Sequence, residues 1–180
     1  AAKGGVKAFN DLPSDFEINP LAQQSRILDA GGNVIANPYD ENRIIVTLDK
    51  ISPWMQKAQI AIEDSRFYTH GGLDLRGFTR ALVSNFSGGD VQGASTLTQQ
   101  YVKITLQENA LRAGDKAAAQ AATAKNYTRK LQELKYAMNV EQNFTKDQIL
   151  QGYLNLVYYG DQAYGVEAAS QNYFGISAAE

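Results

Sequence analysis

The chain has 180 residues, of which 44% are hydrophobic and 20% charged, the composition of a globular domain with a sizeable core. Its net charge of −2 gives no basic field for nucleic acid, and the absence of cysteine excludes disulfides, thiolate catalysis and cysteine-based zinc sites. No stretch approaches the roughly 20 apolar residues that span a bilayer, and the first residues do not form a signal peptide.

The first elements predicted along the chain are short and extended. Residues 1–24 have little periodicity and predict a loose lead-in. Strands are then predicted over 26–28 and 34–36, joined into a hairpin through the GGN turn at 31–33. The segment RIIVTL, residues 43–48, predicts another short strand.

From Ser52 onward the pattern predicts helices. Ser52 can cap a helix with Pro53 at its first position. Apolar residues of this helix recur at helical spacing, namely Trp54, Ala58, Ala61 and Ile62. Asp74 and Ser95 can cap two further helices.

The second half of the chain also predicts helix. The Ala-rich stretch over 107–126 suits either a solvated helix or a flexible excursion. The next helix carries an apolar stripe, made of Tyr127, Leu131, Leu134 and Met138. Thr145 and Gln148 form a capping box, and Gly175 stands where a last helix should end. The sequence therefore predicts a mainly α fold with a small β element near its start.

The segment IAIEDSRFYTHGGLD, residues 60–74, ends an apolar helix in Glu63 and Asp64 and contains the only histidine, His70. A metal site is one alternative, but the pattern favours Asp64 and His70 as hydrogen-bonding groups that fix the turn. Burial by the helix and the negative end of its dipole both disfavour a carboxylate, so we expect a raised pKa for Glu63. Such a pKa suits a general base.

Two polar patterns have both a structural and a functional interpretation. Arg129 and Glu133 lie four residues apart, away from the apolar stripe, and on spacing alone predict an exposed ion pair worth about 0.3–0.5 kcal/mol. The functional alternative is a cleft wall with one cation and one acid. Ser95, Gln99 and Lys103 share a helix face that either binds an anionic or sugar ligand or is simply solvated.

Together these segments resemble the family 51 glycosyltransferases, the peptidoglycan polymerase domains of class A penicillin-binding proteins and of monofunctional transglycosylases. The resemblance covers about residues 60–175. It rests on segments that occur in the family order: EDSRFYTHGGLD, GASTLTQQYVK, RKLQE, KDQILQGYLN and GVEAASQNYFG. The first two are highly specific, whereas RKLQE alone would be weak.

The resemblance implies an α-rich, lysozyme-like glycosyltransferase domain over 25–180, preceded by the lead-in of 1–24. Family members normally continue in closing helices, so we expect a domain shortened at its C-terminus. The stretch 107–126 is longer than is usual in the family. The implied activity is polymerisation of lipid II into β-1,4 glycan strands, with inversion and release of undecaprenyl diphosphate.

The resemblance also implies a role for each motif residue. Glu63 would be the base, and Glu133 would orient the diphosphate or hold a divalent ion, Mg²⁺ or Mn²⁺, for which the sequence shows no dedicated set of ligands. The cations that offset the diphosphate would be Lys103, Arg129 and Lys130. Residues lining the cleft would be Ser95, Thr98, Gln99 and Gln100. Supporting residues would be Asp64, Phe67, His70 and Asn155.

The implied location is the extracytoplasmic face of the bacterial plasma membrane, with any anchor upstream of these residues. The implied partners are lipid II, the growing glycan strand, the membrane surface and cell-wall assembly proteins. Val83 and Phe86 could form a lip that touches lipid, or belong to the core. Two other functions stay open: a lysozyme-like lytic enzyme, which has no use for the three cations, and a truncated inactive domain that binds lipid II or a partner.

Overall fold

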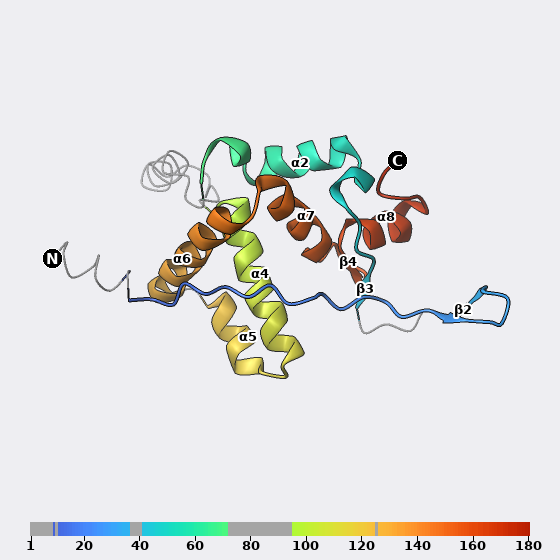
Figure 1. The fold of residues 1–180 in the computed structure, drawn as a ribbon, viewed down its shortest axis with the longest axis horizontal. Coiled ribbons are helices and arrows are strands. Elements are labelled where there is room, and N and C mark those ends of the chain that lie inside the picture. The colour runs from blue at the N-terminus through green and yellow to red at the C-terminus, as the bar shows by residue number, and fades with distance from the viewer. Residues whose placement is uncertain (1–8, 10, 37–40, 72–94, 125) are drawn as a thin grey trace. The chain divides into compact units, whose positions relative to one another are not determined.

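The computed structural model describes residues 9, 11–36, 41–71, 95–124 and 126–180 (Figure 1). The chain divides into two compact units, one formed by 1–18 and 57–149 and the other by 19–56 and 150–180. The described residues form six α-helices and two small sheets, which confirms a mainly α fold with a small β element. None of these helices is long and apolar enough to cross a membrane. The helix predicted from Asp74, with Val83 and Phe86, lies outside the described residues.

Helix α4 (Leu97–Arg112) is the central element of the first unit. Helices α5 (Lys116–Thr123) and α6 (Tyr127–Asn143) both pack against it (Figure 1). Thr96 caps α4 by accepting a hydrogen bond from the Gln99 N–H at 3.2 Å, so the predicted cap at Ser95 is wrong by one residue. The Ala-rich stretch contains the end of α4 and all of α5, and in α5 only Ala119 is buried.

The face of α6 that packs inward differs from the predicted one. Leu131 and Met138 of the predicted stripe are 47% and 42% exposed, whereas Glu133, Ala137 and Val140 are buried. The prediction is wrong because periodicity identifies the faces of a helix but not which face meets a neighbour. Small side chains and a paired carboxylate here allow α6 to approach α4.

An arm of the chain before the first strand also contacts α6. The Lys135 ammonium donates to the carbonyls of Phe9, at 3.1 Å, and Leu12. The Gln132 amide donates to the Pro13 carbonyl at 2.7 Å, and the Phe16 ring packs on Tyr136. The contacts to Leu12 and Pro13 satisfy backbone carbonyls that lie outside any helix or sheet.

The second unit contains both sheets. Strands β1 (Ile27–Leu28) and β2 (Val34–Ala36) form the predicted antiparallel hairpin. Strand β3 (Asn42–Arg43) pairs in parallel with β4 (Ala163–Tyr164), and α8 (Val166–Phe174) packs against both. Gly175 ends α8 with a φ of 71°, which confirms its predicted place as the terminating glycine.

The strand predicted over 43–48 is wrong after its first residue. Beyond Arg43, the side chain of Asn155 in α7 (Lys146–Leu156) bonds both the N–H and the carbonyl of Val46, each at 2.9 Å. Gln151 of the same helix accepts from the Leu48 N–H at 2.9 Å, where the 3-10 helix η1 (Leu48–Lys50) begins. Helix side chains thus provide the partners that a neighbouring strand would have supplied.

Two predicted helix starts are confirmed. Helix α2 (Pro53–Glu63) begins at Pro53, and the Ser52 carbonyl accepts from the Gln56 N–H at 3.2 Å. Helix α7 follows the predicted capping box: the Thr145 N–H donates to the Gln148 side chain at 2.8 Å, and the Gln148 N–H donates to Thr145 Oγ1 at 3.2 Å.

Candidate active site

Glu63 is the last residue of α2, and its carboxylate contacts α4. Gln100 Nε2 donates to Glu63 Oε2 at 2.8 Å. The expectation that an apolar helix buries the approach to Glu63 is wrong, because no residue of α2 is buried and Glu63 itself is half-buried. Trp54 is 78% exposed and Ile62 81%. The apolar periodicity of α2 therefore marks an exposed face.

Asp64 connects the turn after α2 to the start of α4. Its Oδ1 lies 2.6 Å from His70 Nε2, and its Oδ2 accepts from the Leu97 N–H at 3.0 Å. His70 Nδ1 lies 2.5 Å from the Gly71 carbonyl, so an oxygen faces each ring nitrogen. The Asp64 carboxylate, in a residue only 8% exposed, thus fixes the end of α2 against α4.

Replacing Asp64 with Ala should lower the free energy of unfolding by about 2–4 kcal/mol, because the Leu97 N–H loses its cap and His70 its charged partner. Urea denaturation followed by circular dichroism measures the change. Asp15→Ala, at an exposed carboxylate, is the matched control and should unfold as the parent chain does. A D64A midpoint equal to that of D15A would show that the bridge contributes nothing.

The turn after α2 is also anchored to the start of α7. Phe67, in the 3-10 helix η2 (Phe67–Thr69), is fully buried, and the Lys146 ammonium lies 4.5 Å from its ring centroid. The Tyr68 hydroxyl donates to Asp147 at 2.9 Å, and desolvation together with this carboxylate raises the pKa of Tyr68 to about 12. Phe67 is therefore a packing residue of this turn.

Glu133 lies in α6 at the centre of a second charged cluster. Glu133 is only 3% exposed, and one of its carboxylate oxygens pairs with Arg129 while the other pairs with Lys130. The Lys130 ammonium also donates to Ser95 Oγ at 2.7 Å and to Gln99 Oε1 at 2.9 Å. The exposed ion pair predicted from spacing alone is therefore wrong, because these contacts draw Glu133 into the interface with α4.

A hollow of about 550 Å³ opens beside this cluster. Arg129 and Glu133 contribute to its wall, together with α4 and α5. The full lining consists of Leu106, Ala121, Asn126, Thr128, Arg129, Gln132 and Glu133. The second charged cluster thus borders a space large enough for part of a ligand.

The carboxylates of Glu63 and Glu133 are linked by hydrogen bonds to neighbouring residues of α4. Glu63 contacts Gln100, and Glu133 is linked through Lys130 to Gln99. Successive side chains of an α-helix project about 100° apart. Gln99 and Gln100 in the first turn of α4 therefore project on adjacent sides, Gln100 toward Glu63 and Gln99 toward the cluster in which Glu133 lies between two cations.

The remaining predicted site residues differ in their surroundings. Lys103 is half-buried, and its ammonium forms no hydrogen bond or ion pair with any described residue. Thr98 is fully buried and its hydroxyl donates to Glu141, which also pairs with Lys146 at 2.7 Å. Thr98 therefore has no exposed atom with which to make the predicted contact to substrate. Asn155 holds Val46 in the second unit and stabilises the backbone there.

A divalent ion held by Glu133 does not fit the residues present. Both oxygens of its carboxylate already face a cationic side chain, so a metal would have to displace Arg129 and Lys130. Within the described ranges no group of three or more histidine, aspartate or glutamate side chains is placed to hold a metal.

The paired charges of Glu141, which is half-buried, and of Arg43, which is fully buried, were not predicted from the sequence. Glu141 joins Thr98 to Lys146, and its only sequence signal is that it lies five residues before Lys146 across a helix break. Arg43 is fully buried in the second unit, where it pairs with Glu41 and donates to the carbonyls of Ala22 and Asn155. Arg43 carried no signal, because a single arginine in an apolar segment does not reveal its partners.

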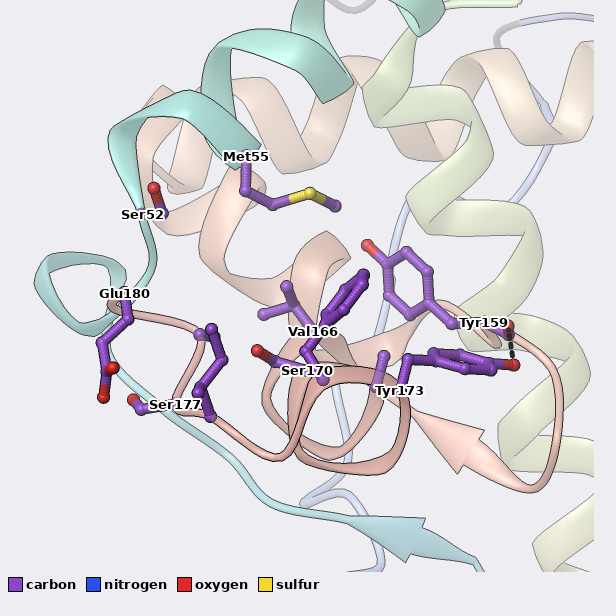
Figure 2. Close-up of a pocket in the computed structure, with 12 residues that line it drawn as sticks. Ser52, Met55, Tyr159, Val166, Ser170, Tyr173, Ser177 and Glu180 are labelled. Atoms are coloured by element: carbon purple, nitrogen blue, oxygen red, sulfur yellow. Dashed lines mark hydrogen bonds between the residues drawn. The ribbon is translucent and has the colours of Figure 1, made fainter.

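The second unit contains a separate, mostly apolar cavity of about 370 Å³ (Figure 2). Met55, Val166 and Tyr173 point into it, and the Tyr173 hydroxyl donates to the Tyr159 carbonyl at 3.0 Å. None of the residues predicted to catalyse or to bind substrate lines this cavity.

Comparison with known proteins agrees with the motifs. A family model described as Transglycosylase matches residues 31–180. Penicillin-binding protein 1A of Escherichia coli (strain K12) is 46% identical over 151 residues, which are 83% of this chain and 16% of that protein. Penicillin-binding protein 1A of Mycobacterium tuberculosis (strain ATCC 25618 / H37Rv) is 40% identical over 164 residues, 90% of this chain and 18% of that protein.

A shorter relative is a monofunctional glycosyltransferase of Staphylococcus epidermidis (strain ATCC 12228 / FDA PCI 1200). It is 42% identical over 132 residues, which are 73% of this chain and 44% of that protein. The chain thus spans less than half the length of each of these relatives. Because the family model covers most of the chain, the chain belongs to the transglycosylase family, the family 51 glycosyltransferases.

Proposed function

We propose that this domain is a peptidoglycan glycosyltransferase that polymerises lipid II into β-1,4 glycan strands. The observation that carries the proposal is the different surroundings of two acids, Glu63 of α2 and Glu133 of α6, which are linked to neighbouring glutamines in the first turn of α4. Glu63 has a neutral partner in Gln100, whereas Glu133 is paired with Arg129 and Lys130. A reaction that removes a proton at one end and expels an anion at the other requires such a division of charge.

Glu63 acts as the general base. It accepts the proton of the GlcNAc 4-OH of the incoming lipid II while that oxygen forms a bond to C1 of the donor MurNAc. The C1–O bond to the diphosphate breaks, and its electron pair leaves with undecaprenyl diphosphate. Because the nucleophile attacks opposite the leaving group, a single displacement converts the α-linked donor into a β-linked product.

Cations beside Glu133 bind the diphosphate. Arg129, which lines the hollow, and Lys130, on the other carboxylate oxygen of Glu133, offset its charge together with Lys103 of α4. Glu133 holds Arg129 and Lys130 in position and prevents the two cations from repelling each other. Stabilising charge that develops on a leaving group is typically one of the largest contributions to catalysis.

The domain works at the outer face of the cytoplasmic membrane, on a substrate that stays anchored in lipid. The exposed face of α2 supports contact with that surface, because Trp54, Ala58, Ala61 and Ile62 are exposed on one side of the helix that ends at Glu63. A large exposed apolar patch commonly marks an interaction site.

Replacing Ile62 with Gln should weaken binding to phosphatidylglycerol vesicles about tenfold, because burying an isoleucine contributes roughly 1.5–3 kcal/mol. Vesicle sedimentation measures the partition coefficient. Leu111→Gln, at a 50% exposed leucine near the end of α4, is the matched control and should bind as the parent does. Equal partitioning of I62Q and L111Q would exclude α2 as the contact.

The test of the function is to mix the protein with lipid II in detergent and to separate the products on a gel. Formation of polymer supports the proposal. Release of soluble fragments from purified glycan would instead identify a lytic enzyme, which the cations around Glu133 disfavour because glycan strands lack a diphosphate. Binding of lipid II with neither product would identify a binding module.

A further inference from the structure

We propose that Gln100 positions the base: its amide holds Glu63 Oε2, so that Oε1 faces the substrate hydroxyl. The inference rests on the proposed function of Glu63. It assigns Gln100 an effect that is exerted through Glu63, whereas the motif resemblance implies direct binding of substrate.

The chemistry of the Gln100 amide and the Glu63 carboxylate determines which of them donates the hydrogen bond. An ionised carboxylate only accepts hydrogen bonds, so the amide nitrogen of Gln100 must face Glu63, as it does at 2.8 Å. Among the described residues, Gln100 makes the only hydrogen bond to this carboxylate. One oxygen is therefore held by the protein, and the other is available to accept a proton.

Glu63 needs such a partner because of its place in α2. It is the half-buried last residue of a helix without buried residues, and its side chain has three torsions that must be ordered for catalysis. Gln100 extends from a better fixed element, since α4 is capped by Thr96 and anchored through Asp64. The hydrogen bond from Gln100 therefore restricts the position of the Glu63 carboxylate relative to α4.

The neighbouring residue shows why two glutamines stand in succession. Gln99 turns its amide oxygen toward the Lys130 ammonium at 2.9 Å, whereas Gln100 turns its amide nitrogen toward Glu63. An amide carries both a donor and an acceptor, so one residue type serves a cation on one side of α4 and an anion on the next. Aspartate or lysine would serve only one of the two.

The test compares Gln100→Met with Gln107→Met, a matched control at a half-buried glutamine further along α4. We expect Q100M to lower kcat about ten- to a hundredfold, which is the effect of losing one hydrogen bond to a charged group. The KM for lipid II and the melting temperature should equal those of Q107M. The acidic limb of the pH–rate profile should move to higher pH, because the lost hydrogen bond favoured the ionised carboxylate.

Gln100→Glu provides a second variant, in which a like charge replaces the donor. The acidic limb should then move further than in Q100M, because two neighbouring carboxylates cannot both ionise easily. A higher KM with an unchanged kcat and pH profile would overturn the inference and assign Gln100 to substrate binding. Behaviour of Q100M identical to that of Q107M would also overturn it.

A measurement without turnover separates this inference from the proposed function. Titration of the Glu63 carboxyl by carbon-13 NMR should move to higher pH in Q100M and remain unchanged in Q107M. If the parent chain makes no polymer but the titration moves, the proposed function fails while the positioning contact stands. If polymer forms but the titration does not move, only the inference is overturned.

Discussion

Replacing Glu63 with Gln is expected to reduce the rate of glycan polymerisation by about 10²- to 10⁴-fold, the contribution typical of a general base. The substitution keeps the shape of the side chain, and the Gln100 amide can still donate to the new carbonyl oxygen. What disappears is the group that accepts the proton of the 4-OH. The chemical step should therefore slow while lipid II still binds.

A fluorescent lipid II assay measures the initial rate, and a binding titration measures the dissociation constant. The matched control is Glu17→Gln, which neutralises an exposed carboxylate on the arm that contacts α4. We expect E17Q to retain the parent rate. A rate in E63Q equal to that in E17Q would exclude Glu63 as the base, and a loss of binding without a loss of rate at saturation would make it a substrate contact.

Replacing Glu133 with Gln is expected to damage both stability and activity. Breaking a buried charge pair costs roughly 3–5 kcal/mol, and we expect about 2–3 kcal/mol here because Arg129 and Lys130 are partly solvated, with side chains 20% and 41% exposed. Polymerisation should fall by about 10²- to 10³-fold, because both cations lose the group that places them beside the diphosphate.

Urea denaturation and the lipid II assay measure the two effects separately. A double variant, Arg129→Gln with Glu133→Gln, should be less destabilised than the sum of its single variants, because it removes one uncompensated charge. If E133Q unfolds at the urea concentration of the parent, the cluster contributes no more than the exposed ion pair that spacing alone predicted.

Helix boundaries could be predicted from the sequence because their causes are local. Pro53 begins α2, Thr145 with Gln148 begins α7, and Gly175 ends α8. In each case the cause lies within one turn: a proline whose φ already suits a helix, a side chain that supplies a missing hydrogen bond, or a glycine with left-handed backbone. The sequence motifs likewise single out Glu63 and Glu133, and their catalytic roles stay a prediction.

Burial could not be predicted, because it depends on residues distant in the sequence. Glu133 is buried since Lys130 reaches Ser95 and Gln99, more than thirty positions earlier. The segment after Arg43 is not a strand because Asn155, 109 positions after Val46, takes its backbone groups. Periodicity within α2 and α6 carries no information about such partners.

The most direct test of the mechanism is the configuration of the new glycosidic linkage, determined by NMR on polymer made by the parent chain, with released undecaprenyl diphosphate counted in the same reaction. A single displacement driven by Glu63 predicts only β-1,4 linkages and one diphosphate for each linkage formed. An α linkage would require two displacements through a covalent intermediate and would contradict the role given to Glu63. Linkages formed without diphosphate release would contradict the role given to the Glu133 cluster.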